Sequence, residues 1–141
     1  MTRTGLRSFG IVLVVFVLGL AAGLGGCASL GPVAPVEVSD VKDVSGTWKG
    51  AVYQSSQFSP DYITLTIRED GSYDIVSARQ PIGTSRGQGK VAISDGRLMF
   101  EGPRGRGVGR VQKNPDGSLT MMVDGTLSDN STLSAQLTRI N

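Results

Sequence analysis

Side chains that could act as nucleophiles, bases or metal ligands are scarce in this chain. Cys27 is the only cysteine, and there is no histidine. The chain therefore lacks the commonest general base and the commonest ligand of a catalytic zinc, and its serines have no obvious activating base. A single cysteine permits no internal disulfide, so the fold must be held by packing alone.

Carboxylates are the remaining candidates for acid–base chemistry. Asp70, Asp95 and Asp116 each precede a glycine, a tight-turn signal in which the aspartate bonds its own backbone. Glu69 adjoins one of these turns, and Asp124 has the outward phase of its expected strand. No two carboxylates converge inward as a glycosidase requires. We therefore expect a protein that is not an enzyme and that carries neither cofactor nor metal.

The beginning of the chain has the parts of an export signal. Arg3 and Arg7 precede an apolar run, Ile11 to Leu20, and small residues follow it. This order is that of a secretory signal peptide. The alternative is an uncleaved transmembrane anchor, although the apolar run is shorter than the ~20 residues that a spanning helix needs.

The segment ends in Leu24-Gly25-Gly26-Cys27, which resembles the lipobox of bacterial lipoproteins. The resemblance implies removal of residues 1–26 as a signal peptide and attachment of acyl chains, such as palmitate, to Cys27. A lipid-anchored location in the cell envelope follows. Ala28 occupies the position where an aspartate retains some lipoproteins in the inner membrane, which favours the periplasmic side of an outer membrane, if the cell has one.

Composition bounds the rest of the chain. Of 14 Lys and Arg residues, Arg3 and Arg7 belong to the leader, so twelve remain against 12 Asp and Glu. A neutral mature chain does not suggest a nucleic-acid binder, and 141 residues leave room for one small domain. Residues 27–43 contain two prolines and no amphipathic period, and are expected to form a lipidated tether. The alternative is a strand packed through Val36, Val38 and Val41.

From Gly46 onward, apolar and polar residues alternate with a period of two, which is typical of strands with one buried face. Tight-turn signals separate the runs, and no helix of useful length fits between them. The pattern predicts an all-β domain at residues 44–141, an eight-stranded antiparallel up-and-down barrel without free edges. The expected strands are 46–54, 61–69, 72–79, 85–94, 96–102, 105–113, 118–127 and 131–140.

Gly46-Thr47-Trp48 on the first expected strand resembles the Gly-x-Trp motif of the lipocalins and the wider calycin superfamily. The resemblance implies a barrel with a closed end, where a late arginine packs across the tryptophan. Arg139 has the inward phase of the last strand, so Trp48 and Arg139 are expected to form a structural plug held by a cation–π contact. Unlike lipocalins, this chain has short strands and lacks the helix that follows their barrel.

Glycines with the inward phase gather at the other end of the expected barrel, among them Gly87, Gly89, Gly105, Gly107 and Gly125. This mouth is expected to be either hollow or sharply bent, because glycine fills no interior space. A hollow mouth would be a shallow cup for an apolar molecule with an anionic head, matched by arginine forks. The candidate ligand-binding residues are a lid at Phe58 and the rim arginines Arg79, Arg86, Arg104 and Arg106. The alternative is a barrel filled by its own side chains.

Basic residues also concentrate on one expected wall. Outward phases on three adjacent strands bring together Arg86, Lys90, Arg97, Arg106 and Arg110. An anionic envelope surface is the natural partner of such a wall, and ordinary solvated charge is the alternative. We therefore expect a non-enzymatic envelope protein that binds an apolar or amphiphilic small molecule. The alternative is a protein- or glycan-interaction module, including the protease-inhibitor type, that uses the barrel exterior.

Overall fold

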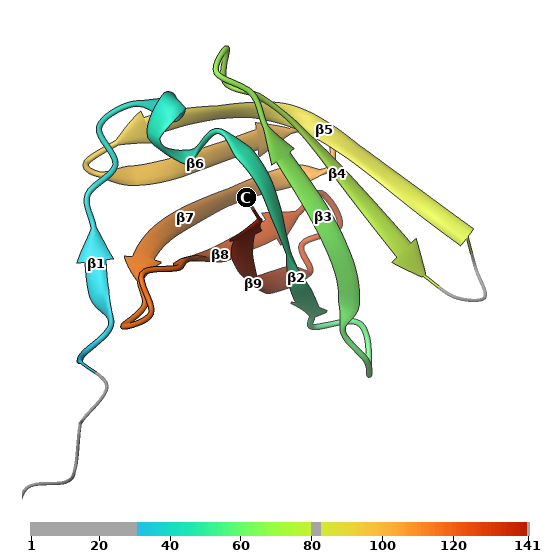
Figure 1. The fold of residues 1–141 in the computed structure, drawn as a ribbon. Helices are drawn as coiled ribbons and strands as arrows, with labels where there is room; N and C mark the ends of the chain where they lie inside the picture. Colours follow the sequence, from blue (N-terminus) through green and yellow to red (C-terminus); the bar gives the residue numbers. More distant parts are fainter. Residues whose placement is uncertain (1–30, 80–82, 141) are drawn as a thin grey trace, which may run out of the picture. The chain divides into compact units, whose positions relative to one another are not determined.

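The computed structural model describes residues 31–79 and 83–140, and these are mostly strand (Figure 1). The predicted leader and Cys27 lie outside this part of the chain. Within it, no helix is long and apolar enough to cross a membrane. The elements are β1 (Ala34–Val36), a 3-10 helix η1 (Val41–Val44), β2 (Gly46–Gln54), β3 (Asp61–Ile67), β4 (Ser72–Arg79), β5 (Gly83–Ser94), β6 (Arg97–Gly102), β7 (Gly105–Lys113), β8 (Leu119–Leu127) and β9 (Thr132–Ile140).

Strands β2 to β9 form a closed antiparallel barrel. Each pairs with the next along the chain, and β9 returns to pair with β2 from Thr47↔Ile140 to Gln54↔Leu133. The eight-stranded up-and-down topology predicted from the period-two pattern is therefore confirmed, with strand ends within two residues of those expected. Closure leaves one face of every strand for the interior, which is why the alternation is so regular.

The N-terminal segment differs from the tether expected for residues 27–43. β1 pairs with the end of β7 through Ala34↔Lys113 and Val36↔Val111. Val38 and Val44 are buried, and the backbone N–H of Val38 donates to Gly96 O at 3.4 Å. Residues 34–44 thus pack on the barrel as the alternative interpretation held. Burial of Val38 and Val44 offsets the conformational entropy that this segment loses when it packs on the barrel.

The end of the barrel next to η1 is plugged. Trp48 is fully buried, and its Nε1–H donates to Val44 O at 2.9 Å. The Arg139 guanidinium lies 5.8 Å from the centre of the indole and donates to Asp43 O at 3.2 Å and to Ser45 O at 2.6 Å. The expected cation–π pair is present, and the same arginine also fixes the η1 segment across the barrel end.

Turns with the sequence Asp-x-Ser recur at both ends of the barrel. In each, the aspartate Oδ1 accepts hydrogen bonds from the hydroxyl and the backbone N–H of the serine two residues later, at 2.6 to 2.9 Å. These bonds lower the pKa of all three aspartates below the ordinary value. The three aspartates, Asp70, Asp116 and Asp129, are therefore charged turn residues. The turn position was predicted for Asp70 and Asp116.

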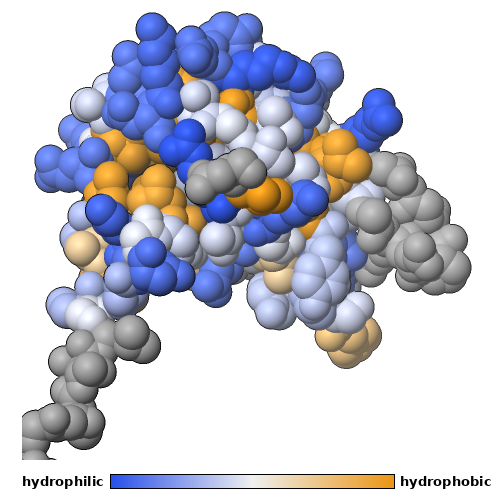
Figure 2. Space-filling model, viewed as in Figure 1, coloured by the Kyte–Doolittle hydropathy of each residue, from blue (hydrophilic) through white to orange (hydrophobic). Residues whose placement is uncertain are grey.

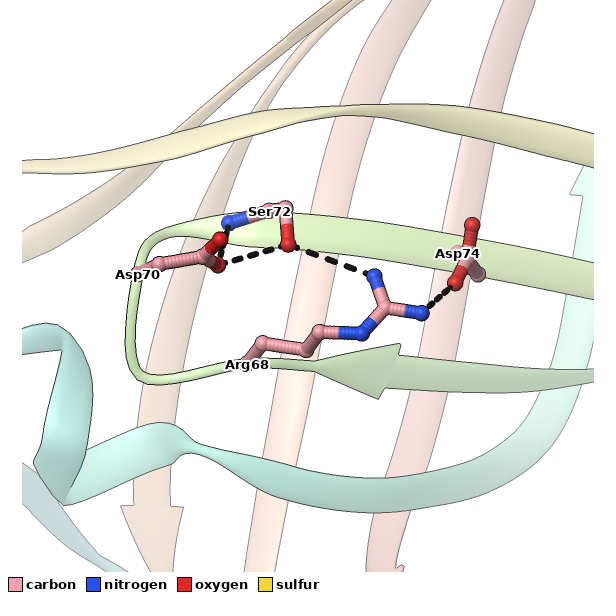
Figure 3. Close-up of polar contacts among 4 residues, drawn as sticks. All are labelled: Arg68, Asp70, Ser72 and Asp74. Atoms are coloured by element: carbon pink, nitrogen blue, oxygen red, sulfur yellow. Dashed lines mark hydrogen bonds and ion pairs between the residues drawn. The ribbon is translucent and has the colours of Figure 1, made fainter.

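Around the β3–β4 turn, the network extends to a second aspartate (Figure 3). Arg68 donates to Ser72 Oγ at 3.2 Å and pairs with Asp74 on the next strand. All four side chains lie on the barrel exterior, where an ion pair contributes little net stability. The cluster therefore orders the β3–β4 hairpin.

Candidate functional site

A cavity of about 520 Å³ occupies the barrel at the end away from the plug. Its deeper wall is apolar, and its outer wall is polar. The apolar lining includes Val52, Ile63, Leu65, Tyr73, Ile75, Phe100, Val123, Leu133, Ala135 and Leu137. The polar lining includes Gln54, Gln57, Asp61, Ser77, Arg86, Gln88, Arg104, Arg106, Ser128 and Asp129. Of the two expected states of this mouth, the hollow one is present, and we call this cavity the cup.

Two aromatic rings form the floor of the cup. Tyr73 and Phe100 meet edge to face, with ring centroids 5.4 Å apart. A Cβ added at Gly89 would lie 2.2 Å from Glu101 O and 2.5 Å from Tyr73 Oη, and one at Gly109 would lie 2.9 Å from Phe100 Cε2. These two glycines therefore make room for rings from neighbouring strands. Burial raises the pKa of Tyr73, which keeps its hydroxyl neutral in the floor.

The other inward glycines at this end of the barrel act in two different ways. A Cβ at Gly87 would meet only Ile75 Cβ, at an ordinary contact distance of 3.8 Å. Gly105, Gly107 and Gly125 also line the cup, but there an added Cβ would come within 2.4 to 3.1 Å of backbone oxygens of the neighbouring strand. The expectation that inward glycines hollow the mouth is thus right for Gly87. The other three serve mainly the close approach of β7 and β8.

The wall of the cup is lowest at the β6–β7 turn. β5 pairs with β4 along Ser72↔Lys90 to Arg79↔Gly83, but with β6 only from Lys90 to Ser94. The β4–β5 pair therefore runs on past the end of β6 (Figure 1). The part of β5 that extends beyond β6 is contacted from the β6–β7 turn. There, Arg104 Nη1 donates to the backbone oxygen of Arg86 at 3.4 Å.

The predicted ligand-binding residues are placed differently from one another. Arg86, Arg104 and Arg106 line the cup at its rim. Arg79 ends β4, and its side chain lies outside the described part of the structure. Phe58 is fully exposed and is not part of the cup lining, so it does not act as a lid in this structure.

Two acidic side chains at the rim were missed by the sequence interpretation. Asp61 and Asp129 line the cup together with the arginines. Asp61 has the same phase as the inward Ile63 and Leu65 on β3, and this signal was available in the alternation. Asp129 lies in the β8–β9 loop, where no strand phase indicates direction. The rim is therefore mixed in charge, with a basic excess among its described residues.

The outer face holds a second hollow, of about 1000 Å³, across β5 to β9 and the end of β2, where Tyr53 lines it. Ala92, Met99 and Val108 give it an apolar strip, and Met99 is 41% exposed. Two of the five residues of the expected basic wall, Lys90 and Arg106, line this hollow, and Glu101 between them pairs in register with both. We call this hollow the outer groove.

No family model matches the chain, and no curated protein matches it. The class is therefore set by geometry alone. It is a small, closed, eight-stranded antiparallel barrel, consistent with a lipocalin-like fold, plugged at one end and open at the other. Among residues 31–79 and 83–140, no three His, Cys, Asp or Glu side chains are grouped to hold a metal ion.

Proposed function

We propose that the protein binds one apolar or amphiphilic small molecule in the cup and acts without enzymatic chemistry. The observation that carries the proposal is the cup itself, about 520 Å³ in volume, with an apolar floor and arginines at its rim. This volume lies within the range of about 300–1,000 Å³ typical of small-molecule sites. A cavity with an apolar floor and polar groups only at the opening is suited to a molecule with one apolar and one polar end.

The chemistry of the two ends sets the orientation of such a ligand. Its apolar part lies on Tyr73 and Phe100, where transfer from water is favourable by about 25 cal/mol per Å² of buried apolar surface. Its head lies at the rim, where the guanidinium groups of Arg86 and Arg106 match a carboxylate or phosphate. Asp61 and Asp129 on the same rim disfavour a head that carries several negative charges.

Filling the cup from one position is the sharpest test. Gly87→Phe places a ring in the cavity from a position where an added Cβ meets nothing closer than 3.8 Å. We expect it to weaken binding of an anthroyloxy-labelled fatty acid at least tenfold, about 1.4 kcal/mol. Fluorescence titration of the labelled fatty acid measures the affinity.

Ala92→Phe is the matched control, because it puts the same ring on the same strand but in the outer groove. We expect this variant to bind the labelled fatty acid as the wild type does. A wild type that binds no labelled fatty acid, or equal loss of affinity in both variants, contradicts a ligand in the cup.

We also propose that the chain is a lipoprotein anchored in the cell envelope through acylated Cys27, on the periplasmic side of the outer membrane where the cell has one. The support is the order of charged start, apolar run and lipobox in the first 27 residues. Cys27→Ser is expected to move the protein from the membrane fraction to the soluble fraction. Two results together would overturn the anchor. The variant would stay in the membrane fraction of the native host, and mass spectrometry would find no acyl chains on the wild type.

The second candidate function is an interaction module on the barrel exterior. The outer groove favours it, because an exposed Met99 beside Val108 and flanking charges has the make-up of a protein-binding surface. Partners of this kind include an envelope protein, a protease or an anionic glycan. The variant pair above separates the two functions, because Ala92→Phe blocks the groove and leaves the cup open.

A further inference from the structure

The aromatic side chains of the described structure fall into two groups. Trp48, Tyr73 and Phe100 are in the core. The other three are the most exposed large apolar side chains of the described residues: Tyr53 at 58%, Phe58 at 111% and Tyr62 at 71%. All three lie within ten residues of one another, on the β2–β3 hairpin. Every exposed aromatic residue between 31 and 140 is therefore carried by one element.

These three aromatic residues form one surface at the mouth. Tyr62 is paired with Ala51, so Tyr53 is its diagonal neighbour on the outer face, within reach of an aromatic ring. Phe58 lies in the loop between the two strands, and this loop ends in apolar atoms at the bottom of the view in Figure 2. Gln54, Gln57 and Asp61 of the same hairpin line the cup. We call Tyr53, Phe58 and Tyr62 the aromatic tip.

We infer that the aromatic tip docks the mouth of the barrel onto a lipid surface that contains anionic lipids. Tyrosine and phenylalanine rings are amphipathic or apolar groups that favour the membrane–water interface, and Phe58 is fully exposed to water. The rim supplies charge of the matching sign, since Arg86, Arg104 and Arg106 outnumber Asp61 and Asp129.

The inference rests on the proposed function, because docking gives a route for an amphiphile between a membrane and the cup. A ligand with an acyl chain resides in membranes and enters water poorly. A mouth held against the lipid surface lets the apolar part of the ligand pass into the cup without full exposure. The aromatic tip and the cup are thus two parts of one path, but they are separable by experiment.

The test uses an added indole as a reporter of membrane contact. The full chain carrying Phe58→Trp is incorporated into vesicles of phosphatidylcholine and phosphatidylglycerol with brominated acyl chains, which quench nearby indoles. We expect loss of most of the added emission and a blue shift, and a weaker effect when phosphatidylglycerol is omitted. Glu69→Trp, in the exposed β3–β4 turn at the plugged end and away from β1, is the matched control and is expected to be quenched weakly.

A second variant separates this inference from the proposed function. Replacing Tyr53, Phe58 and Tyr62 together with serine is expected to slow uptake of the labelled fatty acid from vesicles while leaving its affinity in solution unchanged. If the wild type binds the fatty acid but the indole at position 58 is quenched no more than that at 69, the docking inference is wrong and the cup stands. An unchanged rate of uptake in the serine variant also overturns it and points to a protein partner for the aromatic tip.

Discussion

Trp48→Ala is expected to lower the free energy of unfolding by about 3–5 kcal/mol, the range for removing a large aromatic side chain from a core. Trp48 is fully buried, and its indole N–H donates to Val44 O inside the plug. Truncation opens a cavity beneath η1 and also leaves the Arg139 guanidinium without the ring it covers. Urea denaturation followed by circular dichroism measures the loss.

Arg139 provides the internal comparison for this prediction. Arg139→Ala removes the cation–π contact and two hydrogen bonds to backbone carbonyls, but leaves the indole in place. We expect a loss of about 1.5–3 kcal/mol, typical of hydrogen bonds to a charged group. The double variant should lose less than the sum, because the two side chains share one contact. A loss below about 1 kcal/mol for Trp48→Ala would contradict the plug.

Gly50→Ala is expected to disrupt the closure of the barrel. A Cβ at this position would lie 1.9 Å from Gln136 O and 2.9 Å from the Leu137 Cα, on the strand that pairs with β2. Both are backbone atoms, so relief requires β2 and β9 to separate. The expected cost is about 3 kcal/mol or more, at or above the upper end for overpacking of a core. Thermal unfolding measures it, and a lower midpoint is expected.

The matched control is Gly87→Ala on the opposite wall. There the added methyl meets only Ile75 Cβ at 3.8 Å, so the change is expected to be neutral or to stabilise by up to about 1 kcal/mol through the unfolded chain. Equal stability of the two variants would show that β2 and β9 are not in the close contact seen here.

The barrel was predictable because two local signals agree along most of the chain. The period-two alternation fixes which face is buried, and Asp-Gly pairs such as Asp95-Gly96, where both residues have positive φ, fix where strands end. The segment at 34–44 was harder, because a three-residue strand containing Pro35 has no periodicity of its own. Its structure depends on β7 and on the interior that receives Val38 and Val44.

The site was predicted only in part. The alternation along a strand shows that a glycine faces the barrel interior, but it does not show whether a neighbouring side chain fills the space next to that glycine. Gly87 and Gly89 share a phase, yet Gly87 borders the cup while Gly89 lies under Tyr73. The register of β5 with β4 and the approach of Glu101 O on β6 decide between them. Loop side chains carry still less information, which is why Phe58 was expected as a lid and is found in solvent.

The central claim, that the open end of this barrel is a ligand site, is tested most directly by an NMR titration of the ¹⁵N-labelled full chain in nanodiscs with an unlabelled fatty acid. We predict saturable shifts of the backbone amides of Gly87, Gly102 and Gly105, which line the cup and not the outer groove, with Gly117 in the β7–β8 turn unchanged. Shifts confined to the outer groove residues Ala92, Met99 and Val108, or no saturable shift at any residue, would contradict it.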